Sequence, residues 1–316
     1  MYKYTKNNYY VFSYFWDGYP GLVATNSVRY TKRPCLQNAN NWHFYLDMTK
    51  FRCARKPKPL HIENCIAAEE IYDNRNGLPI SVLMSGGIDS EIVATSFLKI
   101  KAPFTAYILQ FKDNLNIHDI SYAVSFCETN NVNYKLVELD IKKFLKEQAY
   151  DYASYSDTCC AELLSTMWLA DQVSGLPIIG SGEPFFIKKK DHWFYREHER
   201  ITGFYKHFIF QDRPAIPGFF QYSPELLASY STTELIVSLA KNELDRRIQN
   251  SRPIKFDTLK RYYPQLYQRK KYTGFENIPE LKVFRRKLEL MFGDDSYDVE
   301  YEHFVKYLLG SGYDKV

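Results

Sequence analysis

A glycine-containing turn between an apolar run and a helix-like stretch constrains the fold of this chain most. Residues 85–90 read Ser-Gly-Gly-Ile-Asp-Ser. They follow the apolar run 78–84 and precede residues 91–100, in which apolar side chains recur at helical spacing. This order predicts a buried strand, a glycine turn and a helix, the unit from which parallel α/β sheets are built.

The same alternation of strand and helix patterns continues along the chain to residue 179. Further strands are expected at 105–111, 134–139 and 176–179, and helices at 117–130, 141–155 and 161–171. A doubly wound, Rossmann-like parallel sheet with helices on both faces is therefore the predicted fold. Ligands of such sheets bind at the carboxyl ends of the strands, where the strand order reverses. Residues 85–90 and 180–183 both follow predicted strands.

The flanking regions have different patterns, which suggests three parts. We expect a β-rich N-terminal segment (1–60), the α/β domain (61–200) and a mainly helical C-terminal region (201–316). Aromatic and β-branched residues crowd positions 9–16, as in strands. Ser223-Pro224-Glu225 is typical of a helix start, with a capping serine before a proline at the first helical position.

Composition limits the classes of protein and partner that the chain fits. The 41 basic and 37 acidic residues give a net charge of +4, too weak to indicate a nucleic-acid partner, although one stays possible. No apolar stretch approaches the roughly 20 residues of a membrane helix, so we expect a soluble cytoplasmic protein without a membrane partner. The six cysteines form no CxxC pair, and His192 and His198 lack metal-ligand spacing.

The residue types in the glycine turn predict a polyphosphate ligand. Two glycines allow a close approach of the backbone, and the amides at a helix start face anions favourably. Ser85 and Ser90 add hydroxyl donors, whereas the carboxylate of Asp89 suits a magnesium ion. The turn lacks the lysine of the nucleoside triphosphatase P-loop and the GxGxxG pattern of dinucleotide folds, which disfavours transfer of a γ-phosphate.

The hexapeptide SGGIDS resembles the SGGxDS signature of the ATP pyrophosphatases, or PP-loop enzymes. That superfamily includes asparagine synthetase, ammonia-dependent NAD synthetase, GMP synthetase and several tRNA-thiolating enzymes. The resemblance implies an adenine nucleotide alpha hydrolase-like sheet and cleavage of ATP between its α and β phosphates. It also implies that the whole turn binds ATP: Ser85, Gly86, Gly87, Ile88, Asp89 and Ser90.

A second loop, Gly180-Ser181-Gly182-Glu183, resembles the SGEGxDE loop of asparagine synthetases, in which acidic residues help hold magnesium and pyrophosphate. Pro184-Phe185-Phe186 replaces the rest of that pattern. The resemblance implies that Asp89 and Glu183 are the catalytic carboxylates and the magnesium ligands. Ser181 and Gly182 would complete the nucleotide site.

The remaining parts of an ATP site are assigned partly by the same resemblance. Adenine would be recognised at the end of the second strand, by Leu109, Gln110 and Phe111, and Leu83 and Met84 would supply part of an apolar floor. A departing pyrophosphate needs basic groups, for which the runs 188–190 and 269–271 are candidates. Lys270 and Lys271 are preferred as catalytic residues, because Thr273-Gly274 can form a turn that returns the chain toward the crevice.

The leading hypothesis is an AMP-forming carbon–nitrogen ligase that uses ATP and Mg²⁺ and most resembles the synthetase domain of asparagine synthetase. Its acceptor would carry a carboxylate or carbonyl oxygen. Glutamine-dependent asparagine synthetases have a nucleophilic cysteine where this chain has Tyr2, and only about 75 residues precede the glycine turn. We therefore expect no glutaminase domain, and ammonia, another amine or a separate donor protein as the nitrogen source.

Two alternatives remain open. The first is a nucleotide- or tRNA-modifying PP-loop enzyme that transfers sulfur or nitrogen, with Cys127, Cys159 and Cys160 as the thiols to consider. The second is a non-catalytic ATP-binding protein that kept the glycine turn and lost the second acidic loop. Loss of activity on replacing the paired cysteines would favour the first, and ATP binding without pyrophosphate release would favour the second.

Overall fold

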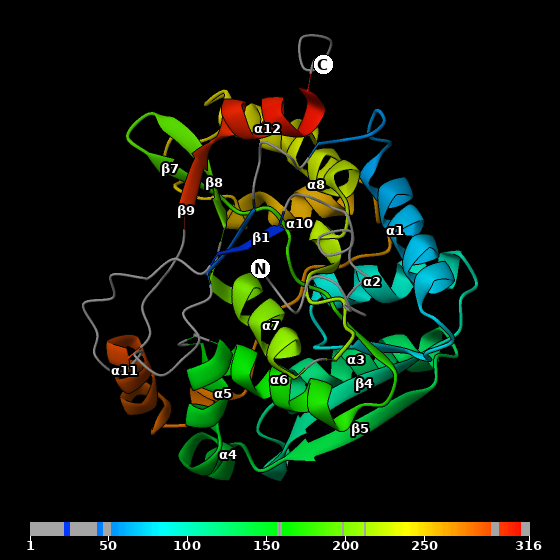
Figure 1. Cartoon of the computed structure of the whole chain (residues 1–316), viewed down its shortest axis with the longest axis vertical. Helices are drawn as coiled ribbons and strands as arrows, with labels where there is room; N and C mark the ends of the chain where they lie inside the picture. The colour runs from blue at the N-terminus through cyan, green and yellow to red at the C-terminus, as the bar shows by residue number, and fades with distance from the viewer. Residues whose placement is uncertain are drawn as a thin grey trace.

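The structure is a computed structural model that describes residues 22–25, 43–46, 52–156, 158, 160–197, 199–211, 213–291 and 297–310 (Figure 1). Its central sheet has four parallel strands: β3 (Ile80–Leu83), β4 (Phe104–Phe111), β5 (Tyr134–Leu139) and β6 (Leu176–Ile179). The strand order is β5-β4-β3-β6. The chain adds β4 and β5 on one side of β3 and then places β6 on the other, so the order reverses between β3 and β6. The predicted parallel α/β fold is confirmed.

Both faces of this sheet are covered, because successive strand residues point into two separate cores. Val82 and Ile178 pack into one core, while Leu83 and Ile179 pack into the other. The first core includes α1 (Leu60–Asn74), α2 (Ile88–Lys99) and α3 (Ile117–Thr129). The second includes α4 (Ile141–Glu147), α5 (Ala149–Ser156) and α6 (Ala161–Gln172). This arrangement is the doubly wound sheet that the sequence predicted.

One predicted helix of the α/β region is divided in two. The pattern at 141–155 predicted a continuous helix, but Gln148, with φ −124° and ψ −32°, separates α4 from α5. Asp140 caps the first of the two by accepting a hydrogen bond from the Lys143 amide at 3.1 Å. Apolar periodicity did not reveal this break, since Phe144 of α4 and Ala153 of α5 are buried in the same core.

The C-terminal region contains six α-helices among the described residues: α7 (Glu199–Phe210), α8 (Pro224–Ser231), α9 (Glu234–Ala240), α10 (Arg252–Lys260), α11 (Leu281–Met291) and α12 (Tyr301–Leu309). The predicted start of α8 is confirmed, because the Ser223 hydroxyl accepts a hydrogen bond from the Leu226 amide at 3.2 Å.

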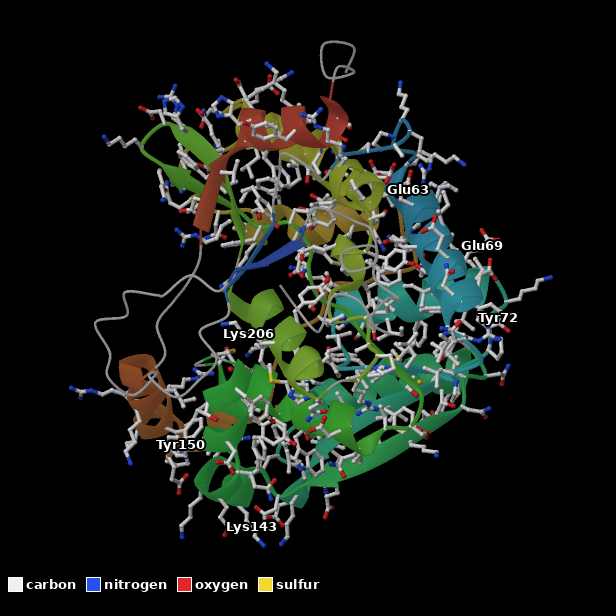
Figure 2. The ribbon with its side chains drawn as sticks, in the orientation of Figure 1. Glu63, Glu69, Tyr72, Lys143, Tyr150 and Lys206 are labelled. Carbon is white, nitrogen blue, oxygen red and sulfur yellow. The ribbon has the colours of Figure 1, made fainter. Side chains whose placement is uncertain are left out.

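Helix α11 packs against the α/β region. Tyr150 of α5 lies beside α11 (Figure 2), and its ring contacts that of Phe284 edge to face, with centroids 5.1 Å apart.

A second sheet, which the sequence pattern did not predict, joins the α/β region to the C-terminal region. Its strands β7 (Phe186–Lys189), β8 (His192–Glu197) and β9 (Tyr297–Glu300) are antiparallel. Figure 1 places this sheet and α12 at one end of the molecule, with β4 and β5 at the other. Arg196 donates two hydrogen bonds to Asp298, at 2.8 and 2.9 Å. Four-residue β9 depends on this distant pairing, so its own sequence gave little sign of a strand.

Of residues 1–51, the structure describes only two short strands. β1 (Leu22–Thr25) and β2 (His43–Leu46) form an antiparallel pair. The predicted strand at 9–16 and the Asp17-Gly18 turn lie outside the described residues. Within the part of the chain that the structure describes, no helix is both long enough and apolar enough to cross a bilayer.

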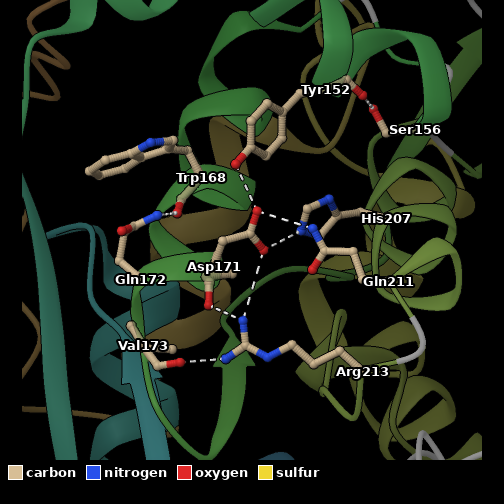
Figure 3. A network of polar contacts seen from close by, with 10 residues as sticks. Tyr152, Ser156, Trp168, Asp171, Gln172, Val173, His207, Gln211 and Arg213 are labelled. Atoms are coloured by element: carbon tan, nitrogen blue, oxygen red, sulfur yellow. Dashed lines mark hydrogen bonds and ion pairs between the residues drawn. The ribbon is translucent and has the colours of Figure 1, made fainter. Parts of the chain in front are cut away.

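A polar network centred on Asp171 ties α5, α6 and α7 together (Figure 3). We call it the Asp171 network; its members are Tyr152, Asp171, His207, Gln211 and Arg213. Asp171 accepts hydrogen bonds from Tyr152 at 2.7 Å and from Gln211 at 3.1 Å, and its other oxygen lies 3.0 Å from Nε2 of His207. Arg213 donates to the Ala170 and Val173 carbonyls at the end of α6. The network thus satisfies both oxygens of a partly buried carboxylate between three helices.

Candidate functional site

The turn after β3 is built so that only glycine fits its tightest position. Gly86 has a φ of +77°, and a Cβ there would lie 2.0 Å from the backbone oxygen of Asp119 in α3. At the other end of the turn, the buried Ser90 hydroxyl donates to the Gly87 carbonyl at 3.0 Å. The turn therefore lies tightly against the start of α3. It presents the first residues of α2, which begins at Ile88, at the carboxyl end of β3.

The loop after β6 lies directly against the first turn of α2. A Cβ at Gly180 would lie 2.9 Å from the Cα of Ser90, so the two loops touch. Ser181 donates from its hydroxyl to the Pro217 carbonyl at 2.7 Å, and Gly182 adopts a φ of +89°. The structure thus brings both predicted loops together at the reversal of strand order, as expected from the meeting of parallel strand ends.

Asp89 and Glu183 are joined by a residue that the sequence analysis did not single out. Lys255, on α10, places its Nζ atom 2.6 Å from Oδ2 of Asp89 and 2.6 Å from Oε1 of Glu183. The three side chains are 21–31% exposed. We call Asp89, Glu183 and Lys255 the carboxylate–lysine cluster. It places one cation between two carboxylates from the two predicted loops.

A weak signal in the sequence could have pointed to Lys255. Residues three and four apart lie on one face of a helix, and Lys255 stands four before Leu259 and three before Thr258, both of which are buried. A lysine on the buried face of a short helix is unusual and requires an anionic partner. The sequence alone gave no means of identifying that partner, because Asp89 lies 166 residues away.

Burial and mutual attraction set the charges of the carboxylate–lysine cluster. Burial raises the pKa of Asp89 to about 6; the attraction of Lys255 opposes this shift and the repulsion of Glu183 adds to it. Burial also acts to raise the pKa of Glu183, but the charge of Lys255 and its hydrogen bond lower it below the ordinary value. Burial opposes the charge of Lys255, yet both carboxylates raise its pKa. Near pH 7 the cluster therefore holds two negative charges and one positive charge.

The residues of this cluster fit a magnesium ion that is bound together with phosphate. Oδ1 of Asp89 is buried and, among the described residues, has no hydrogen-bond partner. No group of three or more His, Cys, Asp or Glu side chains in the described part of the chain could form a closed metal cage. Magnesium commonly binds one or two carboxylates and takes its other ligands from water and substrate phosphates. The free oxygen of Asp89, with Glu183 nearby, matches that kind of site.

The two preferred lysines occupy different environments. The charge of Lys271 is close enough to lower the pKa of both Asp89 and Glu183. Lys270 is exposed, and its carbonyl lies 2.9 Å from Nε2 of His118. In the other basic run, Lys189 pairs with Asp298 of the second sheet at 2.5 Å. Of the two preferred lysines, Lys271 is therefore the one whose charge acts on both carboxylates.

The residues predicted to bind adenine are already engaged within the protein. Asn116 donates to the Leu109 carbonyl at 2.8 Å and accepts from the Phe111 amide at 2.7 Å. The Gln110 side chain donates to Asn114 at 2.8 Å. A base that used the Phe111 amide would have to displace Asn116, whereas the Leu109 carbonyl keeps a second lone pair.

The residues predicted to form an apolar floor are buried in the two cores. Leu83 is 5% and Met84 2% exposed, and they pack on opposite faces of the sheet. Cys127 donates to the sulfur of Met84 at 3.8 Å, and burial raises the pKa of its thiol to about 11. Burial thus argues against Cys127 as a sulfur donor. Cys160 lies 3.1 Å from a carboxylate oxygen of Glu162, and Cys159 is outside the described residues.

Comparison of the chain with protein-family models and with curated protein sequences found no match. Comparison with solved structures found similar proteins, and two of them are described here. One is the NMN synthetase from Francisella tularensis, with 15% identity, a TM-score of 0.33, and coverage of 72% of this chain and 92% of the other. The second is an NH3-dependent NAD synthetase from Campylobacter jejuni in complex with the nitrate ion, with 17% identity, a TM-score of 0.35, and coverage of 73% and 94%. At these values the likeness carries no argument about activity.

Proposed function

We propose that the protein is an ATP-dependent ligase that forms AMP and pyrophosphate and joins an amine to an activated acceptor. The carboxylate–lysine cluster is the observation that carries this proposal, because it sets Asp89 of the SGGIDS turn beside Glu183 of the second loop. Such a constellation suits binding of a magnesium-bound polyphosphate, whose negative charge must be neutralised while it departs. The glycine turn and the start of α2 supply the adjoining anion site.

The proposed reaction has two steps. An oxygen of the acceptor attacks the α-phosphorus of ATP, the bond from that phosphorus to the bridging oxygen breaks, and pyrophosphate leaves. The amine then attacks the activated carbon, loses a proton, and displaces AMP. Ammonia, another amine or a separate donor protein supplies the nitrogen, as the sequence analysis expected. The acceptor is a molecule with a carboxylate or carbonyl oxygen.

The glycine turn and the carboxylate–lysine cluster have distinct proposed roles. Ser85, Gly87 and Ser90 hold the β and γ phosphates at the start of α2. Asp89 and Glu183 would hold a magnesium ion, which would neutralise phosphate charge. Lys255 keeps a positive charge between these carboxylates and prevents their mutual repulsion.

The test is incubation with magnesium, candidate carboxylates, ammonia and ATP labelled at the α-phosphate, followed by separation of AMP from ADP. We expect AMP and pyrophosphate in the wild-type reaction and neither in Asp89→Ala. Lys143→Met is the matched control. Lys143 lies at the lower edge of the molecule (Figure 2), is exposed, and pairs only weakly with Glu147 at 3.8 Å.

Other outcomes of this experiment separate the competing functions. Formation of ADP would overturn the proposed bond cleavage. Tight ATP binding without turnover, measured by calorimetry, would instead support the non-catalytic alternative. Loss of AMP formation in a Cys159→Ser, Cys160→Ser variant that binds ATP normally would support sulfur transfer.

A further inference from the structure

Arg269 is the residue of the basic run 269–271 whose side chain enters the protein. Its guanidinium lies over the ring of Tyr267, 4.4 Å from the centroid, and over that of Tyr122, at 5.0 Å. The side chain is 6% exposed and forms an ion pair with Glu91, which is 8% exposed. Burying such a pair is costly unless the geometry is specific. The basic run made Arg269 a candidate for stabilising pyrophosphate, but the structure places its guanidinium against the backbone of the glycine turn.

The second contact of Arg269 is with the glycine turn itself. Nη1 donates to the Gly86 carbonyl at 2.8 Å, while Nη2 donates to Glu91 in the first turn of α2. One planar guanidinium therefore joins the turn to the helix that follows it. The fixed directions of its donors make the arrangement more specific than a lysine could be.

The contact with Gly86 fixes the orientation of one peptide group. The carbonyl and the following amide of a trans peptide point in opposite directions. With the Gly86 carbonyl held by Arg269, the Gly87 amide points away from Arg269, and it donates to Ser85 Oγ at 3.3 Å. Neither glycine has a side chain that would prevent this peptide from turning over. A turned peptide would present a carbonyl oxygen, which repels phosphate, in place of an N–H donor.

The backbone around Arg269 is itself held in place. The Tyr272 amide donates to Asp119 at 2.9 Å. Gly274 has a φ of +84°, and a Cβ there would lie 2.6 Å from the Leu115 carbonyl oxygen. These contacts attach the segment 269–274 to the start of α3, against which Gly86 also packs. Arg269 thus reaches the turn from a fixed support.

We propose that Arg269 is a positioning residue that holds the Gly86–Gly87 peptide with its N–H toward the phosphate-binding side of the turn. The inference rests on the proposed function, because it assigns to this turn the task of binding the ATP phosphates. Arg269 acts through the backbone and does not contact the substrate.

The experiment compares wild type with Arg269→Met and Arg269→Lys. Hydrogen–deuterium exchange is measured over residues 84–91, ATP binding by calorimetry, and kcat and KM by AMP formation. In Arg269→Met we expect about tenfold or faster exchange in the turn and a KM for ATP raised about ten- to a hundredfold. Arg269→Lys should recover part of both effects. Arg261→Met is the control, since Arg261 is 45% exposed and pairs with Glu234.

The readouts separate this inference from the proposed function. Unchanged exchange over residues 84–91 in folded Arg269→Met would overturn the positioning role, whatever the activity. If Arg269→Met does not fold, the same comparison is made with Arg269→Lys. A wild-type protein that neither binds nor cleaves ATP would overturn the proposed function, while the exchange data would still decide whether Arg269 orders the turn. Faster exchange with unaltered ATP binding would overturn the proposed effect on phosphate binding.

Discussion

Two partly buried carboxylates in this molecule, those of Asp89 and Asp171, have opposite environments. Asp171 has hydrogen-bond partners at both oxygens, whereas Asp89 has Lys255 at one oxygen and no partner at the other among the described residues. Burial acts to raise the pKa of Asp171, but the hydrogen bonds and charge of His207 lower it, with further help from Tyr152 and Gln211. Burial raises the pKa of Asp89 to about 6.

The difference separates a carboxylate that stabilises the fold from one that is kept available for a ligand. A fully bonded carboxylate favours its charged form and thereby favours the folded state. A carboxylate with a buried free oxygen reduces stability until something binds it, and such groups concentrate at functional sites. The following experiments test this distinction, beginning with the largest expected effect.

Asp89→Ala should lower AMP formation about a thousandfold or more, because it removes the proposed magnesium ligand and its charge. Asp171→Ala should leave the rate per folded molecule within about threefold, since the Asp171 network joins α5, α6 and α7. Initial rates at saturating ATP, normalised by circular dichroism, provide the comparison. Equal losses of AMP formation in the two variants would contradict the distinction between a ligand-binding carboxylate and one that stabilises the fold.

Lys255→Met should lower kcat/KM about a hundredfold, because it leaves Asp89 and Glu183 without the cation between them. The pKa of Asp89 should then rise further above 6, since repulsion from Glu183 is no longer opposed. Rates measured from pH 5 to 9 would show the acid limb moving to higher pH. An acid limb that does not move would contradict the role of Lys255, and Lys143→Met serves as the control.

Asp171→Ala should reduce the free energy of unfolding by about 2–4 kcal/mol, because it leaves the donors of His207, Tyr152 and Gln211 without an acceptor. Asp89→Ala should reduce the free energy of unfolding by less than about 1 kcal/mol. The carboxylate charge of Asp89 is only partly compensated in the folded protein, so its removal costs little stability. Urea denaturation of both variants measures the two values. A larger loss in Asp89→Ala would reverse our assignment of the two carboxylates.

The pH dependence should distinguish the two carboxylates without mutation. Asp89 must be ionised to bind magnesium, so AMP formation should fall by about half near pH 6 as its carboxyl takes up a proton. The raised pKa of Asp89 means that its contribution to stability is greatest in acid and lost as the pH rises through about 6.

The lowered pKa of Asp171 has the opposite effect on how stability depends on pH. Its contribution to stability is present above the ordinary pKa of 3.8 and is lost as the pH falls through its lower folded value. We therefore expect activity to decline near pH 6 well before the Asp171 network is lost below pH 3.8. Thermal melting followed from pH 7 to 3 provides the check, and parallel loss of activity and network stability would contradict it.

Most of the α/β region could be predicted from the sequence, because its signals are local. The SGGIDS turn and the apolar runs of β3 and β6 depend on neighbouring residues, as does the Ser223 cap of α8 in the C-terminal region. The meeting of the loops that carry Asp89 and Glu183 followed from one topological rule about parallel strands. The break at Gln148 was missed, since apolar periodicity does not register a local change of backbone angles.

The sequence by itself thus determined the alternation of strands and helices around the central parallel sheet and the residue types at the two loops. Only the tertiary structure decided that Lys255 lies between Asp89 and Glu183, that Arg269 holds the Gly86 carbonyl, and that β9 pairs with β8. The physical reason is the range of the forces involved. Backbone sterics and side-chain periodicity act over a few residues, whereas the partner of a buried charge is chosen by the packing of helices more than a hundred residues apart.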